Sequence, residues 1–249
     1  MAGKPTILVV NDDGIHGPGL RPLVAAMRRV GRVVVVVPHA ERSADSHCLT
    51  LHKPIRVSKI ERDFYTLSGS PADCARFAIL EIIGSKVDLA VSGINNGLNL
   101  GEDVVYSGTV AGAMEATMLA IPSIAFSRSR SDEPRYAAAT VFAQKIARMT
   151  LSRGLPDGVC LNVNFPESAR KYKPATVVRL GQRVYSKDVT KRADPRGEHY
   201  YWLAGKTVKG VPSKGTDVAA IAMGHISITP LHVDNTDQPT LQNLKTWGF

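Results

Sequence analysis

Short apolar runs alternate with longer amphipathic segments over the first 157 residues of this 249-residue chain. The short runs end in turn residues, and a continuous valine run that Pro38 closes is typical of a strand buried on both faces. We expect strands at 6–10, 32–37, 88–94 and 123–127, with weaker ones at 55–57 and 64–67. Amphipathic segments predict helices over 17–30, 71–80, 110–120 and 136–153. This alternation predicts an α/β fold in which helices cover a parallel sheet.

The pattern changes after residue 158. We expect strands at 159–164, 176–180, 200–203 and 225–229, and helices at 217–223 and 237–246. A long polar segment lies between two of these strands, which is unusual inside a compact domain. We therefore expect 181–199 to form a protruding arm, which is either an element exchanged between subunits or a mobile surface loop. The whole chain, 1–249, is expected to form a single domain with a core (1–157) and a C-terminal part (158–249).

The composition indicates a protein with a substantial core, since 44% of the residues are hydrophobic. No apolar run approaches the ~20 residues of a membrane-spanning helix, and the first residues lack the features of a signal peptide. Three cysteines, Cys48, Cys74 and Cys160, form no close pair and no metal-binding spacing. This usage favours a reducing compartment. We therefore expect a cytoplasmic protein that has no membrane partner.

The net charge of +9 fits either a nucleic-acid ligand or an anionic small substrate. Much of the positive charge falls between residues 170 and 196, where the sequence contains no recognisable nucleic-acid-binding module. A solvated arm explains this charge equally well. We therefore expect no specific nucleic-acid partner.

The first predicted strand ends in two adjacent carboxylates and a glycine, Asp12, Asp13 and Gly14. Neighbouring residues on a strand point to opposite faces, so the two carboxylates can converge only where the chain turns. Gly14 permits such a turn. Carboxylate oxygens of this kind suit Mg²⁺, Mn²⁺ or Ca²⁺. The alternative is that both residues only cap the following helix or form a turn.

Further polar residues follow two other predicted strands. Ser43 lies in the loop after the second strand, and Asn95 follows the strand at 88–94. Ligands of open α/β sheets bind beyond the carboxyl ends of the strands. The loops therefore deliver carboxylate, hydroxyl and amide oxygens to one rim, which suits a metal that also holds phosphate. Taken singly, Ser43 and Asn95 are ordinary turn residues.

The next segment has the features of an anion site. Residues 93–101 are rich in glycine and asparagine, and Ser107, Gly108 and Thr109 then open a helix. Free N–H groups at a helix N-terminus bind phosphate readily, and the two hydroxyls add donors. An ordinary N-cap by Thr109 explains the pattern equally well.

Six ordered motifs extend over nearly the whole chain: NDDG at 11–14, Pro38 with ERS at 41–43 and His47, GSPADC at 69–74, SGINNG at 92–97, SGTVAGA at 107–113 and SITPL at 227–231. With these motifs the chain resembles the SurE family, stationary-phase survival proteins that act as metal-dependent 5′/3′-nucleotidases. The resemblance implies a Rossmann-like core, a C-terminal part whose extended β arm is used in oligomerisation, and a homodimer or homotetramer.

The resemblance also implies roles for individual residues. One divalent metal ion per subunit, Mg²⁺ or Mn²⁺, would be bound by Asp12, Asp13, Ser43 and Asn95. Phosphate would be contacted by Asn96 and by Ser107, Gly108 and Thr109. Two positions depart from the family pattern: Ser46 stands where Gly is common, and Asn96 stands where Arg is common. The loss of an arginine beside a phosphate would weaken anion binding or alter substrate preference.

We therefore expect a hydrolase that cleaves nucleoside 5′- and 3′-monophosphates to nucleoside and phosphate, with short polyphosphate as a further candidate substrate. Water activated by the metal would attack phosphorus in line, oriented by Asp12 or Asp13. Asn96, Ser107 and Thr109 would stabilise charge on the equatorial oxygens.

His47 can change charge near neutral pH, which makes it a candidate acid for the leaving group. The alternative is a loop histidine that hydrogen-bonds to the backbone. Both interpretations are consistent with its place in the second loop.

Two other classes of protein are alternatives to a nucleotidase. Haloacid-dehalogenase-type phosphatases use an Asp nucleophile two residues before a second Asp, whereas here the carboxylates are adjacent. A non-catalytic nucleotide or polyphosphate sensor is compatible with the positive charge. However, no Gly-rich dinucleotide or phosphate-loop motif is present to support it.

Overall fold

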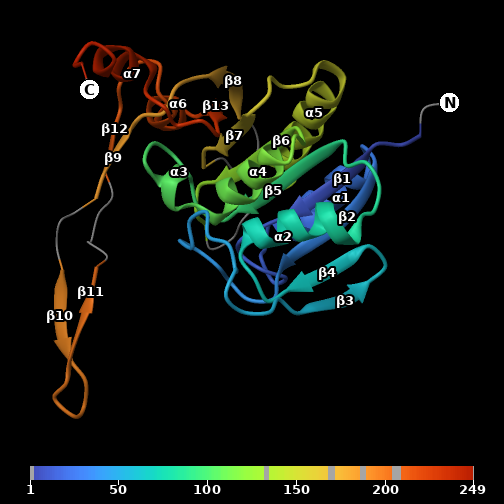
Figure 1. Cartoon of the computed structure of the whole chain (residues 1–249), viewed down its shortest axis with the longest axis horizontal. Helices are drawn as coiled ribbons and strands as arrows, with labels where there is room; N and C mark the ends of the chain where they lie inside the picture. The colour runs from blue at the N-terminus through green and yellow to red at the C-terminus, as the bar shows by residue number, and fades with distance from the viewer. Residues whose placement is uncertain (1–2, 132–134, 168–171, 186–188, 204–208, 249) are drawn as a thin grey trace.

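The computed structural model of the chain describes residues 3–131, 135–167, 172–185, 189–203 and 209–248. Within these ranges a nine-stranded sheet forms the centre of the molecule (Figure 1), in the order β3-β4-β2-β1-β5-β6-β7-β13-β8. Its strands are β1 (Thr6–Val10), β2 (Arg32–Pro38), β3 (Val57–Glu61), β4 (Phe64–Leu67), β5 (Leu89–Asn95), β6 (Ser123–Arg128), β7 (Val159–Phe165), β8 (Lys173–Val177) and β13 (His225–His232).

The sheet is mostly parallel, as the sequence predicts. Strands β4, β2, β1, β5, β6 and β7 pair in parallel, and β13 pairs in parallel with β8. Only β3 with β4 and β13 with β7 form antiparallel pairs among the described strands of this sheet. The predicted α/β class is therefore confirmed. Because the central strands run the same way, their carboxyl ends meet at a single edge.

Helices cover both faces of the sheet. On one face, α1 (Leu20–Arg28) and α5 (Ala137–Arg153) pack over Ile7 and Val9 of β1. On the other, α2 (Pro71–Phe77) and α4 (Gly108–Met118) cover the same sheet, and Leu8 and Val10 lie in the apolar cluster of that face. Successive β1 residues thus enter opposite cores, which explains why this strand is apolar throughout.

Several element boundaries differ from those predicted. The first helix begins at Leu20 rather than 17, because residues 14–20 form turns and a Cβ at Gly19 would lie 1.9 Å from the Ile94 carbonyl oxygen. The helix at 71–80 changes after Phe77 into a π-helical turn, η1 (Ala78–Ile82). A short helix, α3 (Asp103–Tyr106), was not predicted, and the strand expected at 55–57 lies instead at Val57–Glu61 (β3). The last two helices are α6 (Asp217–Ala222) and α7 (Gln238–Leu244).

Two antiparallel strand pairs extend away from the sheet (Figure 1). In this β arm, β9 (Gln182–Val184) pairs with β12 (Lys209–Val211), and β10 (Thr190–Ala193) pairs with β11 (His199–Trp202). The arm thus reaches further along the chain than 181–199, and residues 186–188 of that stretch lie outside the described residues. Its use in oligomerisation stays a prediction, as does the division of the chain at residue 157.

Two further predictions from the composition can be compared with the structure. None of the helices in the described ranges has the length and apolar character that crossing a bilayer requires. Cys48 is exposed, whereas Cys74 and Cys160 are buried, and all three are free thiols. A cytoplasmic location stays a prediction.

Candidate metal and phosphate site

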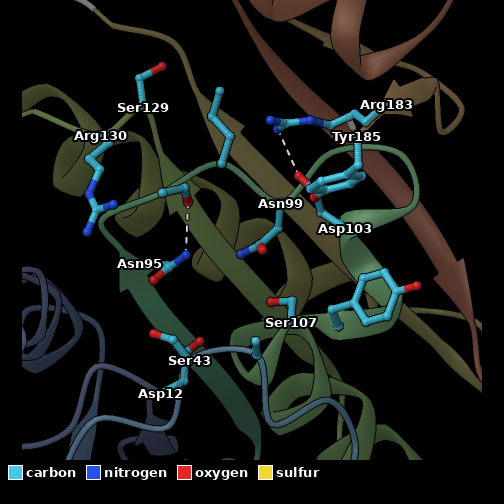
Figure 2. Close-up of a pocket in the computed structure, with 14 residues that line it drawn as sticks. Asp12, Ser43, Asn95, Asn99, Asp103, Ser107, Ser129, Arg130, Arg183 and Tyr185 are labelled. Carbon is cyan, nitrogen blue, oxygen red and sulfur yellow. Dashed lines mark hydrogen bonds and ion pairs between the residues drawn. The ribbon is translucent and has the colours of Figure 1, made fainter. Parts of the chain in front are cut away.

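The loops at the carboxyl ends of β1, β2 and β5 bring Asp12, Ser43 and Asn95 to the wall of one cavity of about 460 Å³ (Figure 2). A backbone hydrogen bond of 2.8 Å from the Arg42 amide to the Asp12 carbonyl joins the first two loops. The second loop is therefore held against the end of β1. Ser43 owes its position near Asp12 to this contact.

Asp12 is a buried carboxylate, with 3% of its surface exposed. The Thr109 hydroxyl donates a hydrogen bond of 2.5 Å to Oδ1 of Asp12. Gly108 packs so closely that a Cβ there would lie 2.8 Å from the Asp12 Cβ. Burial raises the pKa of Asp12 to about 6, opposed by the Thr109 hydrogen bond and increased further by the charge of Asp13.

Asp13 is half-buried and faces a second cavity, of about 720 Å³. Burial raises its pKa, a backbone hydrogen bond from Asn96 lowers it, and the charges of Glu41 and Arg130 act in opposite directions. The two adjacent carboxylates thus line different cavities. Ser43, Asn95, Gly97 and Arg130 line both cavities, and we call this shared wall the seam.

The seam carries oxygen atoms that suit a hard cation. Nδ2 of Asn95 donates to the Gly97 carbonyl at 3.0 Å, so its Oδ1 faces the side of Ser43 and Asp12 (Figure 2). The exposed Ser43 hydroxyl donates to Glu41 at 2.8 Å. Within the described ranges, no three His, Cys, Asp or Glu side chains cluster as a metal site. A cation here would therefore depend on two carboxylates and neutral oxygens, which fits Mg²⁺ or Mn²⁺.

The residues predicted to contact phosphate divide between the two cavities. Ser107 lines the first cavity and caps α4, its Oγ accepting from the Val110 amide at 3.1 Å. Asn96 lines the second cavity. Thr109 is fully buried, and its hydroxyl is engaged by Asp12. The structure therefore gives the Thr109 side chain a positioning contact with Asp12, and leaves Ser107 and the start of α4 facing the first cavity.

His47 lies away from both cavities. Its Nε2 is 2.7 Å from Oε2 of Glu115, a carboxylate with 1% exposure that Arg76 also contacts at 2.5 Å. Burial of Glu115 opposes its ionisation, but the hydrogen bonds and charges of His47 and Arg76 lower its pKa. His47 thus bonds a carboxylate rather than the backbone, and it ties the second loop to α4.

Ser46, where glycine is common in the family pattern, takes a backbone conformation that favours glycine. Its φ is +55°, in the left-handed region. The Ser46 hydroxyl donates to the Val105 carbonyl at 2.6 Å, and its amide donates to the Tyr106 carbonyl at 3.1 Å. These bonds to α3 hold the serine in that conformation and fix the loop that carries Ser43.

A buried amide network fixes the loop after β5. The Asn99 carbonyl accepts from Asn162 at 2.8 Å and from Asn164 at 3.0 Å, and its side chain donates to Ser127 at 2.7 Å. Strands β6 and β7 therefore hold this loop, and it is the loop that carries Gly97.

Sequence reasoning missed the opposite wall of the first cavity. Arg183 and Tyr185, at the base of the β arm, reach Asp103 (Figure 2). Arg183 forms an ion pair of 2.8 Å with Asp103, and the Tyr185 hydroxyl donates to the same carboxylate. Tyr106 completes this side of the cavity. No local motif signals these contacts, because they join residues more than 75 positions apart in the sequence.

Comparisons with known proteins find relatives that match nearly the whole chain. The family described as "Survival protein SurE" matches residues 7–187. The "5′-nucleotidase SurE" of Geobacter metallireducens is 45% identical over 98% of this chain and 97% of that protein. A protein of the same name from Thermoanaerobacter sp. is 39% identical over 98% of both chains. The crystal structure of the SurE protein from Aquifex aeolicus superposes with a TM-score of 0.86 at 40% identity, covering 97% of this chain and 99% of that one.

Proposed function

The chain belongs to the SurE family, and we propose that it is a metal-dependent nucleotidase that hydrolyses nucleoside 5′- and 3′-monophosphates. Relatives of near-equal length carry the name 5′-nucleotidase, which supports the hydrolase and its 5′-nucleotide substrates. The observation that carries the rest of the proposal is the seam. The seam supplies an amide oxygen and a hydroxyl, and the cavities that share it are lined by the Asp12 and Asp13 carboxylates, one in each. Ser107, at the N-terminus of α4, lines the first cavity.

Asp12, Asp13, Ser43 and Asn95 would hold the metal. Asp12 fits this role because it is an almost fully buried acid that forms no ion pair with any described basic residue. A buried carboxylate without a cation is costly, so the site favours a positive ligand. Bound there, a divalent cation supplies Lewis-acid stabilisation of phosphoryl oxygens and lowers the pKa of water.

The protein's own residues would divide the remaining tasks. Thr109 holds Asp12 in one orientation through its 2.5 Å hydrogen bond. The start of α4, with Ser107 and the amide of Gly108, offers N–H donors to the phosphoryl oxygens. We assign the orientation of the attacking water to Asp13, because its carboxylate is more accessible than that of Asp12.

The first cavity suits the nucleoside. Its volume of about 460 Å³ lies within the range of small-molecule sites. Tyr106 and Tyr185 supply aromatic surface for a base, and the Asp103–Arg183 pair supplies polar groups for a sugar or base edge. Leaving-group protonation is not assigned to His47, since it lies outside both cavities. Short polyphosphate stays a candidate substrate, because the second cavity continues past the seam.

We also propose that the chain forms a homodimer or homotetramer through the β arm. The described residues of β10 and β11 are exposed throughout, and an isolated two-stranded ribbon is marginally stable in water. Exposed Tyr201 and Trp202 in the ribbon support contact with another subunit.

The experiment that tests the nucleotidase is a phosphate-release assay on 5′- and 3′-mononucleotides. The protein is treated with EDTA, and Mg²⁺ or Mn²⁺ is then added back. We expect release only with metal, loss of release in Asp13→Asn, and normal release in Asp157→Asn, an exposed carboxylate far from the seam. Metal-independent release would contradict the metal role. Tight nucleotide binding by the folded protein without any release of phosphate would favour a non-catalytic nucleotide sensor.

A further inference from the structure

Two arginines stand at the carboxyl end of β6, beside the seam. Arg128 is the last residue of the strand, and Arg130 follows two positions later. Arg130 lines both cavities together with Ser43, Asn95 and Gly97. In Figure 2 its side chain lies on the same side of the first cavity as Asn95. A guanidinium at this position can reach a ligand that sits in the first cavity, in the second, or across both.

The guanidinium of Arg130 is free to bind a ligand. The residue is exposed, and within the described ranges it forms no hydrogen bond and no ion pair. Its charge nevertheless acts on the nearby carboxylate of Asp13. An exposed cation near Asp13 that is not paired with it is available to an anionic ligand in the cavities.

Arg128 is a buried cation that already lies against position 96. Arg128 is 2% exposed, its Nη1 donates to Oδ1 of Asn96 at 3.4 Å, and its guanidinium lies 5.4 Å from the Tyr136 ring centroid. Within the described ranges it has no carboxylate in ion-pair distance. An arginine at 96 would place a second cation against this buried one, which is unfavourable. Asn96 accepts a hydrogen bond instead.

We propose that Arg130 binds a phosphoryl oxygen of the substrate at the wall that the two cavities share. Its planar fork of N–H donors matches the geometry of a phosphoryl group. The proposal deepens the nucleotidase function and rests on it for the identity of the phosphate ester. The binding of the phosphoryl group itself can be tested without turnover.

The test is calorimetric titration of inorganic phosphate into the Mn²⁺-loaded protein. We expect Arg130→Ala to weaken phosphate binding by about ten- to a hundredfold, the effect of losing a hydrogen bond to a charged group. Arg130→Lys should fall between this variant and the wild type, because it keeps the charge without the fork. The matched control is Arg135→Ala, an exposed arginine in the same segment that lines neither cavity.

Mn²⁺ affinity, followed by electron paramagnetic resonance, separates ligand binding from structural damage. We expect Mn²⁺ to bind Arg130→Ala as tightly as wild type or more tightly, because a cation near Asp13 has been removed. Equal phosphate affinity in Arg130→Ala and wild type would overturn the proposal, as would an equal loss in Arg135→Ala. A loss of both Mn²⁺ and phosphate binding would also overturn it, by showing a disrupted site.

The two proposals fail in different ways. If the wild type binds phosphate through Arg130 but hydrolyses no nucleotide, the nucleotidase proposal fails and the Arg130 proposal stands. If the wild type hydrolyses nucleotides and Arg130→Ala has the same kcat/KM and phosphate affinity, the Arg130 proposal alone fails. Where the wild type is active, we expect kcat/KM of Arg130→Ala to fall in step with its loss of phosphate affinity.

Discussion

Replacing Asp12 with asparagine is expected to stabilise the metal-free protein while abolishing nucleotide hydrolysis. Burial raises the pKa of this carboxyl group from its ordinary value of 3.8 to about 6, despite the hydrogen bond from Thr109. Well below pH 3.8 the group is protonated in both the folded and the unfolded chain, so it adds no pH-dependent cost. As the pH rises from 3.8 to about 6, the unfolded chain releases this proton while the folded protein still holds it, so stability is lost, and the loss levels off at higher pH.

The magnitude follows from the size of this shift. A rise from 3.8 to about 6 is a shift of roughly two pH units, and each unit corresponds to about 1.36 kcal/mol. The free energy of unfolding of wild type should therefore fall by about 3 kcal/mol on account of Asp12 between acid and neutral pH. Asparagine carries no charge at either pH, so the Asp12→Asn variant avoids this loss.

The assay is urea unfolding of both proteins in EDTA at about pH 4.5 and about pH 7.5. The quantity compared is the difference in free energy of unfolding between variant and wild type, because the titrating groups remote from Asp12 cancel in it. We expect this difference to shift in favour of Asp12→Asn by about 2 kcal/mol between the two pH values, since roughly 1 kcal/mol of the loss has already occurred at about pH 4.5. Excess Mn²⁺ should then stabilise wild type and leave the variant unchanged.

Asp157→Asn serves as the control, since the free energy of unfolding of a surface variant should agree with that of wild type within about 0.5 kcal/mol at both pH values. A difference between Asp12→Asn and wild type that is the same at both pH values would refute the reasoning. So would a shift that favours wild type at neutral pH, because it would mean that the native protein stabilises the ionised form of Asp12.

Three further changes test the surroundings of Asp12. Thr109→Val removes a hydrogen bond to a charged group, which is worth about 1.5–3 kcal/mol, and should raise the pKa of Asp12 further. Mn²⁺ binding should therefore be weakened more at acid than at alkaline pH. Equal weakening at every pH would contradict this. Gly108→Ala places a Cβ against Asp12 and should cost about 1–3 kcal/mol of stability together with most of the activity, measured by urea unfolding and phosphate release. His47→Ala leaves the buried Glu115 without one partner and should lower stability by about 1–3 kcal/mol, while the basic limb of the pH–rate profile stays in place; loss of that limb would restore His47 as the acid.

The architecture of this protein follows from local patterns to a large extent. The valine run of β2 and the apolar run that Asp12 ends predict two central strands within one residue of their observed limits. Each is buried on both faces, so pattern and environment agree. The boundary errors occur where tertiary contacts decide. Gly19 passes so close to the Ile94 carbonyl that α1 begins three residues later than its periodicity indicates.

In the candidate site, too, some features follow from local sequence patterns and others depend on tertiary contacts. The strand ends predict that Asp12, Ser43 and Asn95 share one rim, and the structure places all three in one cavity wall. The direction in which a side chain points does not follow from the strand pattern. Thr109 looks like a phosphate donor at a helix start, but its hydroxyl points at Asp12, and only the packing of α4 against β1 determines this. Arg130 gave no signal because exposed loop arginines are common in any basic sequence.

The wall formed by the β arm shows how distant segments come to shape one cavity. Asp217, fully buried at the start of α6, accepts hydrogen bonds from the amides of Gly101 at 2.9 Å and Gly181 at 2.7 Å. Gly101 precedes Asp103, and Gly181 precedes Arg183, so a single carboxylate anchors both partners of the ion pair that lines the cavity. The first strand of the arm cannot shift without moving this wall. The shape of the first cavity and the position of the arm are therefore coupled through a contact that no segment of the sequence displays by itself.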